Sequence, residues 1–135
     1  MEYSDVRWVQ RFQHYEQAFR FLDGALKKES VSDIERMGII QSFEVCFELG
    51  WKVLKDILLE GGQVLASPRD VIKQAAQNGI ITDAELWLRG LEDRNLSTHT
   101  YDEATARSLE ARIRGDYLRM FSELFTYGDQ HRACA

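Results

Sequence analysis

A single proline, Pro68, interrupts an otherwise helix-compatible chain of 135 residues. Apolar residues recur at intervals of three and four, and the strict alternation typical of β-strands is nearly absent, so the periodicity predicts helices throughout. The first helix is expected over residues 4–28, because an apolar stripe suited to lengthwise packing runs through it. This stripe contains Trp8, Phe12, Tyr15, Phe19, Leu22 and Leu26. We predict an all-α protein of about five helices.

Capping boxes, in which Ser or Thr precedes Glu by three residues, mark three helix starts. They predict a second helix over residues 32–60, a fourth after residue 82 and a fifth from residue 100. Their positions are Ser32/Glu35, Thr82/Glu85 and Thr100/Glu103. Ser67 and Pro68 predict a short third helix that ends at Asn78-Gly79. The fifth helix has its own apolar stripe of Leu109, Ile113, Tyr117, Met120, Phe121 and Leu124. We expect one domain over residues 1–135, with a C-terminal tail that frays over about residues 128–135.

Composition excludes several functional classes. The apolar fraction of 44% supports a real core, while the net charge of −5 argues against a broad surface for long nucleic acid. No apolar run approaches the length of a membrane span, and the N-terminus lacks a signal peptide. The two cysteines, Cys46 and Cys134, form no zinc-site or disulfide pattern, so we expect no metal or cofactor. These features favour a cytoplasmic protein.

The second helix is apolar on most sides between Phe43 and Leu59. A helix of this kind is buried on more than one side. In a domain of this size the second side is covered either by a partner chain or by other helices of the same bundle. The sequence alone leaves both interpretations open.

The segment from Asp93 to Glu103 places an arginine, a histidine and a tyrosine in the pattern R-x4-H-x-Y. In one continuous helix Arg94 and His99 would diverge by roughly 140°, so we expect a break at the intervening Ser-Thr pair that lets both point into one space. Arginine can hold phosphate oxygens with two donors, and histidine can transfer a proton near neutral pH. The spacing also fits a structural role, in which His99 fills a helix junction and Arg94 pairs with a carboxylate. The candidate carboxylates are Glu92, Asp93 and Asp102.

Neighbouring residues have alternative roles of their own. Asn95 either donates a hydrogen bond to a phosphate or caps the fourth helix. Tyr101 is either a partly buried aromatic residue at a helix start or a hydroxyl at the mouth of a cleft. On the second helix, Glu44 and Glu48 either face that cleft or are solvated and paired with Lys52.

Four parts of the sequence together carry a resemblance to a known family. They are residues 35–56, the run Ser67-Pro68-Arg69, Trp87, and residues 93–103. In order and spacing, over roughly residues 5–127, they resemble the nucleotidyltransferase substrate-binding protein family, which belongs to the HEPN superfamily of helical-bundle proteins.

The resemblance implies an up-and-down, HEPN-like bundle that forms a homodimer. Such proteins pair with a small, separately encoded nucleotidyltransferase of the minimal type, in a module that resembles a toxin–antitoxin pair. The HEPN motif R-x4-6-H maps onto Arg94 and His99, which in HEPN ribonucleases meet their dimer mates in a cleft and cut RNA without metal. The position that partner transferases can modify with AMP maps onto Tyr101.

Three functions therefore remain open. The first is a non-catalytic subunit that docks the transferase and helps to bind its substrate or nucleotide. The second is a metal-independent endoribonuclease toxin that uses Arg94 and His99 and is neutralised by AMPylation of Tyr101. The third is a helical dimerisation module whose motif is vestigial. One histidine in each chain supplies one proton-transfer group, so the ribonuclease chemistry is more sensible in a dimer.

Overall fold

The computed structural model describes residues 6–97 and 102–134. Within those ranges every regular element is helical, which confirms the predicted all-α class. The elements are α1 (Arg7–Ala25), α2 (Asp33–Glu60), α3 (Pro68–Gln77), α4 (Ala84–Ser97), α5 (Glu103–Arg112), the π-helical turn η2 (Ile113–Tyr117), α6 (Leu118–His131) and the 3₁₀ turn η3 (Arg132–Cys134). The elements α5, η2 and α6 follow one another without a break and form one long rod.

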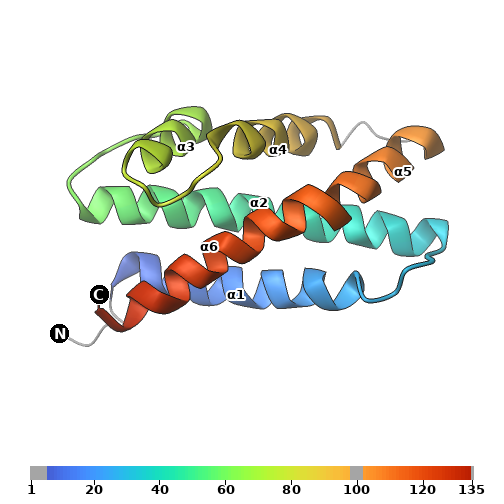
Figure 1. Ribbon diagram of the computed structural model, residues 1–135, viewed down its shortest axis with the longest axis horizontal. Helices are drawn as coiled ribbons and strands as arrows, with labels where there is room; N and C mark the ends of the chain where they lie inside the picture. The colour runs from blue at the N-terminus through green and yellow to red at the C-terminus, as the bar shows by residue number, and fades with distance from the viewer. Residues whose placement is uncertain (1–5, 98–101, 135) are drawn as a thin grey trace.

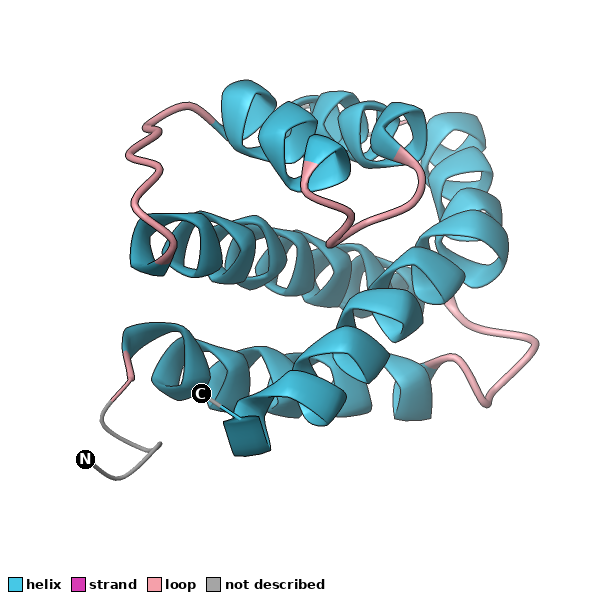
Figure 2. Cartoon of the chain, turned by 60° about the vertical axis from the view of Figure 1, so that its left-hand side comes forward, coloured by secondary structure: helices cyan, strands magenta, loops and turns pink. Residues whose placement is uncertain are grey.

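The central element is α2, which contacts α1, α3, α4, α5 and α6. Figure 1 shows α1 along one side of α2 and the α3–α4 pair along the other, while the rod of α5 and α6 crosses α2 obliquely. The turned view of Figure 2 keeps α1 and the α3–α4 pair on opposite sides of α2. The side of α2 that faces away from the rod is therefore the side left open.

The two predicted apolar stripes meet in the core beneath the rod. Every member of the α1 stripe is buried except the half-buried Phe19, and every member of the rod's stripe is buried. The Tyr15 hydroxyl donates a 2.6 Å hydrogen bond to the Phe121 carbonyl, so the only polar atom of that ring is satisfied in the core. The apolar periodicity thus predicted which faces of these helices pack.

The apolar run of α2 is buried mostly within its own chain. Seven of its side chains between Phe43 and Leu58 are buried among the other helices: Phe43, Cys46, Phe47, Trp51, Val53, Leu54 and Leu58. The alternative of a central helix in one bundle therefore accounts for most of this run. Some apolar side chains of α2 do remain exposed, namely Ile34, Met37, Val45 and Leu59.

Two of the predicted helix starts are confirmed in detail. In the capping box of α2, the Ser32 backbone N–H donates to Glu35 Oε1 at 2.8 Å, and the Glu35 N–H donates to Ser32 Oγ at 3.2 Å. The Ser67 hydroxyl accepts from the Asp70 N–H at 3.1 Å, with Pro68 as the first residue of α3.

The other two predicted capping boxes are wrong. The N-cap of α4 is Asp83, whose carboxylate accepts from the Leu86 N–H at 3.0 Å, while the Thr82 hydroxyl donates to Glu123 instead. The rod begins at Glu103, with Asp102 as its N-cap. In both places an aspartate lies between the threonine and the helix, and aspartate is the stronger N-cap.

The predicted helix ends also need correction. The first helix runs from Arg7 to Ala25, shorter than residues 4–28 at both ends, although residues 1–5 lie outside the described range. The last helix continues to His131, and the expected fraying of residues 128–135 stays a prediction. Two ion pairs of Arg132 hold this end, one to Glu16 on α1 at 2.8 Å and one to Asp129 at 2.7 Å. Among the described helices, none is long and apolar enough to span a membrane.

Candidate functional site

The described part of the candidate site is centred on Arg94 in the last turn of α4. Its guanidinium Nη2 lies 3.4 Å from Glu48 Oε2 on α2, and the Arg94 side chain is half-buried. If Arg94 has only a structural role, the sequence predicted that it pairs with Glu92, Asp93 or Asp102. The observed partner, Glu48, instead comes from another helix. The pair leaves a planar cation at the edge of the open side of α2, where it can offer two donors to a phosphate.

Glu48 is itself held in place by its own helix. Its Oε2 accepts a 3.2 Å hydrogen bond from Trp51 Nε1, and its Oε1 lies 3.3 Å from Lys52 Nζ. The predicted pairing of Glu48 with Lys52 is therefore confirmed. The contact of Glu48 with Arg94 was not predicted, because no local spacing relates residues 46 positions apart.

Asp93, the residue before Arg94, is bound from the rod. Arg112 donates from Nε to Oδ2 at 2.8 Å and from Nη2 to Oδ1 at 3.1 Å, and the Tyr117 hydroxyl donates to Oδ2 at 2.5 Å. The hydrogen bond to Asp93 raises the pKa of Arg112. Burial, followed by the same carboxylate, raises the pKa of Tyr117. Sequence reasoning missed both partners, although Asp93 was placed within the candidate segment.

The other predicted site residues are placed only in part. Asn95 is exposed and lies within α4, which runs on to Ser97, so it is not the residue that ends the helix. His99 and Tyr101 lie outside the described residues, so their predicted convergence with Arg94 stays a prediction.

The N-terminus of the rod is already occupied by a carboxylate. Asp102 Oδ2 accepts from the Thr105 N–H at 3.2 Å and from the Thr105 hydroxyl at 2.8 Å. These hydrogen bonds lower the pKa of Asp102. The helix end thus meets part of its demand for negative charge within the chain.

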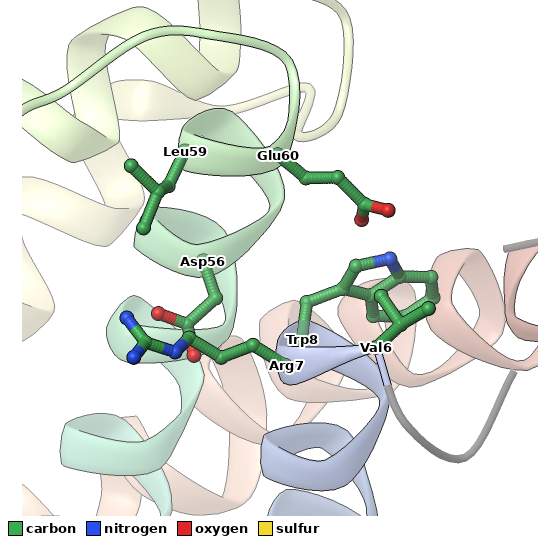
Figure 3. Close-up of a pocket in the computed structure, with 6 residues that line it drawn as sticks. All are labelled: Val6, Arg7, Trp8, Asp56, Leu59 and Glu60. Carbon is green, nitrogen blue, oxygen red and sulfur yellow. The ribbon is translucent and has the colours of Figure 1, made fainter. Parts of the chain in front are cut away.

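A hollow lies at the C-terminal end of α2, between the start of α1 and the end of α2 (Figure 3). Its volume is about 230 Å³, and its lining residues are Val6, Arg7, Trp8, Asp56, Leu59 and Glu60. The buried Asp56 carboxylate pairs with Arg11 Nε at 3.0 Å, so its charge is already balanced. Asp56 lies two turns beyond Glu48, roughly 12 Å along the helix, so this hollow is separate from the Arg94 site.

A metal centre has no support in the described ranges. No group of three or more His, Cys, Asp or Glu side chains there could hold a metal ion. The site instead offers a fixed cation, Arg94, flanked by two carboxylates that are each held by other side chains.

The fold and this site define a class of small helical-bundle proteins with a cationic residue at the end of the fourth helix. The model of the family described as "Nucleotidyltransferase substrate binding protein like" matches residues 10–127. The chain belongs to this family, which confirms the resemblance found from the sequence.

Relatives from bacteria support the assignment. The chain is 31% identical over 88 residues to a protein named probable ribonuclease HepT from Haemophilus influenzae, and the match covers 62% of this chain and 60% of that protein's length. A solved structure from Thermus thermophilus is 37% identical with a TM-score of 0.78, and the match covers 84% of this chain and 98% of the other.

Two further solved structures share the fold. One, from Haemophilus influenzae, is described as revealing the fold of a substrate binding domain of a nucleotidyltransferase; it is 26% identical, with a TM-score of 0.79 and coverage of 88% of this chain and 99% of the other. The other is a HEPN toxin from Shewanella oneidensis, described as tri-AMPylated and in complex with an MNT antitoxin. It is 16% identical with a TM-score of 0.75 over 93% of this chain and 98% of that one, a likeness that shows the fold alone.

Proposed function

We propose that this protein is the HEPN-type subunit of a two-component module, in which it pairs with a separately encoded minimal nucleotidyltransferase and helps to bind its substrate or nucleotide. The observation that carries the proposal is the family match over residues 10–127, together with a site that leaves Arg94 at the edge of an open helix face. The description of the Haemophilus influenzae neighbour supports the same role.

The working form of this subunit is a homodimer that pairs across the open side of α2. A row of exposed residues follows α2 at helical spacing on that side: Ile34, Met37, Gln41 and Val45. Ile34 is 85% exposed and Val45 is 43% exposed. Large apolar side chains in a row on one helix are typical of surfaces that a partner covers. Glu48 continues the row by one turn, so a two-fold axis beside it brings two Arg94 side chains toward one seam.

The dimer is tested with a pair of matched valine substitutions. Val45→Glu places a charge in the row, whereas Val64→Glu places the same charge in the loop between α2 and α3, where the valine is 81% exposed. Light scattering after size-exclusion chromatography should give a dimer for wild type and Val64→Glu, and a folded monomer for Val45→Glu. A wild-type monomer at micromolar concentration contradicts the proposed seam.

Pairing with the transferase is tested separately. Co-expression with a small nucleotidyltransferase encoded beside this reading frame should yield a complex that survives two chromatography steps. After incubation with ATP, intact-mass measurement should show addition of AMP to wild type and no addition to Tyr101→Phe. Failure to form any complex contradicts the pairing role, and equal labelling of both proteins places the modification elsewhere.

A second candidate function is metal-independent RNA cleavage by Arg94 and His99. The observation that favours it is the anchoring of the Arg94 region by Glu48 and Asp93, because phosphate chemistry depends on donors fixed before the substrate arrives. The name of the Haemophilus influenzae relative supports this reaction. In this mechanism Arg94 stabilises charge on the phosphate while two His99 side chains of a dimer act as base and acid.

The ribonuclease is tested by RNA digestion in EDTA. His99→Ala and Arg94→Gln should each abolish cleavage, whereas Arg89→Gln, on the same helix but exposed and outside the motif, should leave the rate unchanged. Cleavage by His99→Ala at the wild-type rate removes His99 from the mechanism. An inactive wild type, together with a stable transferase complex, leaves the binding role as the function.

A further inference from the structure

Two different elements hold Asp93 and Arg94, two neighbouring residues near the C-terminal end of α4. Glu48 on α2 holds the guanidinium of Arg94, and the rod holds the carboxylate of Asp93. Both carboxylate oxygens of Asp93 are engaged, by two nitrogens of Arg112 and by the hydroxyl of Tyr117. The Asp93 side chain is only 14% exposed, and a carboxylate so far from water is costly unless it is paired in this way.

The π-helical turn explains how one helix presents both partners of Asp93. Arg112 and Tyr117 are five residues apart, and in an α-helix they would point roughly 140° away from each other. A π-helical turn bonds each residue to the fifth one along, so such residues lie on one side. The Leu118 N–H donates to the Ile113 carbonyl in this pattern. The turn therefore directs both the guanidinium of Arg112 and the phenol of Tyr117 at Asp93.

The two elements that this contact joins, α4 and the rod, lie on either side of residues 98–101 in the sequence. Asp93 belongs to the last turns of α4, which ends at Ser97, and Arg112 ends α5, which begins at Glu103. A contact between Asp93 and Arg112 therefore sets the rotation of the last turns of α4 against the rod. Because Arg94 is the next residue, the same contact sets the direction in which its side chain leaves the helix.

We propose that Asp93, Arg112 and Tyr117 form a positioning clasp for Arg94, built by the π-helical turn. The clasp fixes the backbone of α4 while Glu48 steadies the guanidinium, so that Arg94 meets a phosphate in one orientation. This role rests on the proposed function in one respect, namely that Arg94 contacts the phosphate of RNA or nucleotide. Arg112 and Tyr117 touch no substrate and act only through Asp93.

The test compares two arginines of α5. Arg112→Gln removes the clasp's positive charge, and Arg107→Gln removes an arginine whose ion pair within the described residues is to Glu103 of its own helix, at 3.0 Å. The readouts are kcat and KM for RNA cleavage, the thermal midpoint, and the Nε–Hε NMR signal of Arg94, assigned by its loss in Arg94→Lys. We expect Arg112→Gln to lower kcat by at least about tenfold with little change in KM, because small misplacements of a positioned group are costly. It should also shift and broaden the Arg94 signal, and Arg107→Gln should change none of these.

Conservative variants separate positioning from mere stability. Arg112→Lys should restore only part of kcat, since lysine is a point charge that lacks the two-nitrogen fork. Tyr117→Phe removes one hydrogen bond and should give an intermediate loss with the same change in the Arg94 signal. A purely structural clasp would instead lower activity in step with the unfolded fraction and leave the Arg94 signal of folded molecules unchanged.

A folded Arg112→Gln protein with the wild-type kcat and the wild-type Arg94 signal overturns the proposal. If Arg112→Gln does not fold, Tyr117→Phe decides by the same two criteria. If wild type cleaves no RNA, the ribonuclease function fails, and the Arg94 signal alone still decides whether the clasp positions that side chain.

Discussion

The two halves of the long C-terminal rod are held to the bundle by different forces. The α6 half packs apolar and aromatic side chains against α1 and α2, with Phe121 at its centre. The α5 half also buries Ala106 and Leu109 in the core, but three charged side chains add directional contacts to other helices, namely Glu110, Arg112 and, in the π-helical turn, Arg114. The apolar half determines that the rod joins the bundle, and the charged half determines where the ends of other helices lie against it.

The charged half contains a network as well as the Asp93 clasp. Glu110 binds Arg36 of α2 at 2.7 Å through one oxygen and Arg114 at 2.7 Å through the other. Arg114 also donates to the Leu26 and Lys28 carbonyls just after α1, at 3.0 and 2.8 Å. These carbonyls follow a helix end and need donors from elsewhere. Through its contacts with Arg114 and Arg36, Glu110 thus links the end of α1 to the start of α2.

Among these variants, Gly128→Ala should give the largest loss in the free energy of unfolding, because it disturbs the packing of the apolar half. A Cβ at this position would lie 2.6 Å from Phe12 Cζ and closer still to two other atoms of that ring. Since Phe12 is fully buried among other rings, it has no room to move. Urea denaturation should show a loss of about 3 kcal/mol in the free energy of unfolding. A loss below about 0.5 kcal/mol would mean that this end is loosely packed and that the comparison is wrong.

In the charged half, Glu110→Gln should lower the free energy of unfolding by less than Gly128→Ala does. The substitution keeps the size of the side chain but leaves Arg36, whose side chain is 5% exposed, without its closest anion. Arg36 retains Asp33 at 2.8 Å, so we expect a loss of about 2 kcal/mol in unfolding free energy rather than the full cost of an orphaned charge. Arg107→Gln, which breaks an exposed pair on the same helix, is the control and should cost less than about 0.5 kcal/mol.

Low pH should lower the free energy of unfolding through protonation of the same carboxyl group, that of Glu110. Burial tends to raise the pKa of Glu110, but hydrogen bonds from Arg114 and Arg36 outweigh it and lower the pKa in the folded protein. A lowered pKa means that the stabilisation is complete above the unfolded value of about 4.3 and is lost as pH falls through the folded value. Between about pH 5 and pH 3, the unfolding free energy of wild type should therefore fall more steeply than that of Glu110→Gln. Parallel curves would show that Glu110 is not the group that couples this region to pH.

The difference between the apolar and charged halves of the rod also accounts for how much of the fold could be predicted from the sequence. Apolar periodicity predicted both stripes because burial on one helix face leaves a local record in the spacing. The π-helical turn left such a record as well, since Leu109, Ile113, Tyr117 and Phe121 are separated by three successive steps of four. In an α-helix these steps would rotate the stripe by about 120°, whereas all four side chains are buried together. Three consecutive steps of four are therefore a usable signal for a π-helical turn.

The candidate site was less accessible to the same reasoning. The motif located Arg94, but its contact Glu48 and the contacts of Asp93 lie 46, 19 and 24 positions away in the sequence. Charged side chains carry no periodic signal of such pairings, because any exposed helix face also contains them. The caps failed for a related reason: with Thr and Asp adjacent at residues 82 and 83, the pattern alone could not choose the residue that accepts the first N–H groups.

The smallest effect concerns Gly115, in the turn between the two halves. A Cβ there would have no neighbour within 4 Å, and its backbone is not in the left-handed region that favours glycine. Gly115→Ala should therefore stabilise the protein by about 0.5–1 kcal/mol, because alanine loses less backbone freedom on folding. Equilibrium unfolding in urea measures the gain, and the Arg94 Nε–Hε signal should stay unchanged. A destabilised variant with a shifted signal would show that the π-helical turn needs glycine, and that the two halves of the rod are coupled through it.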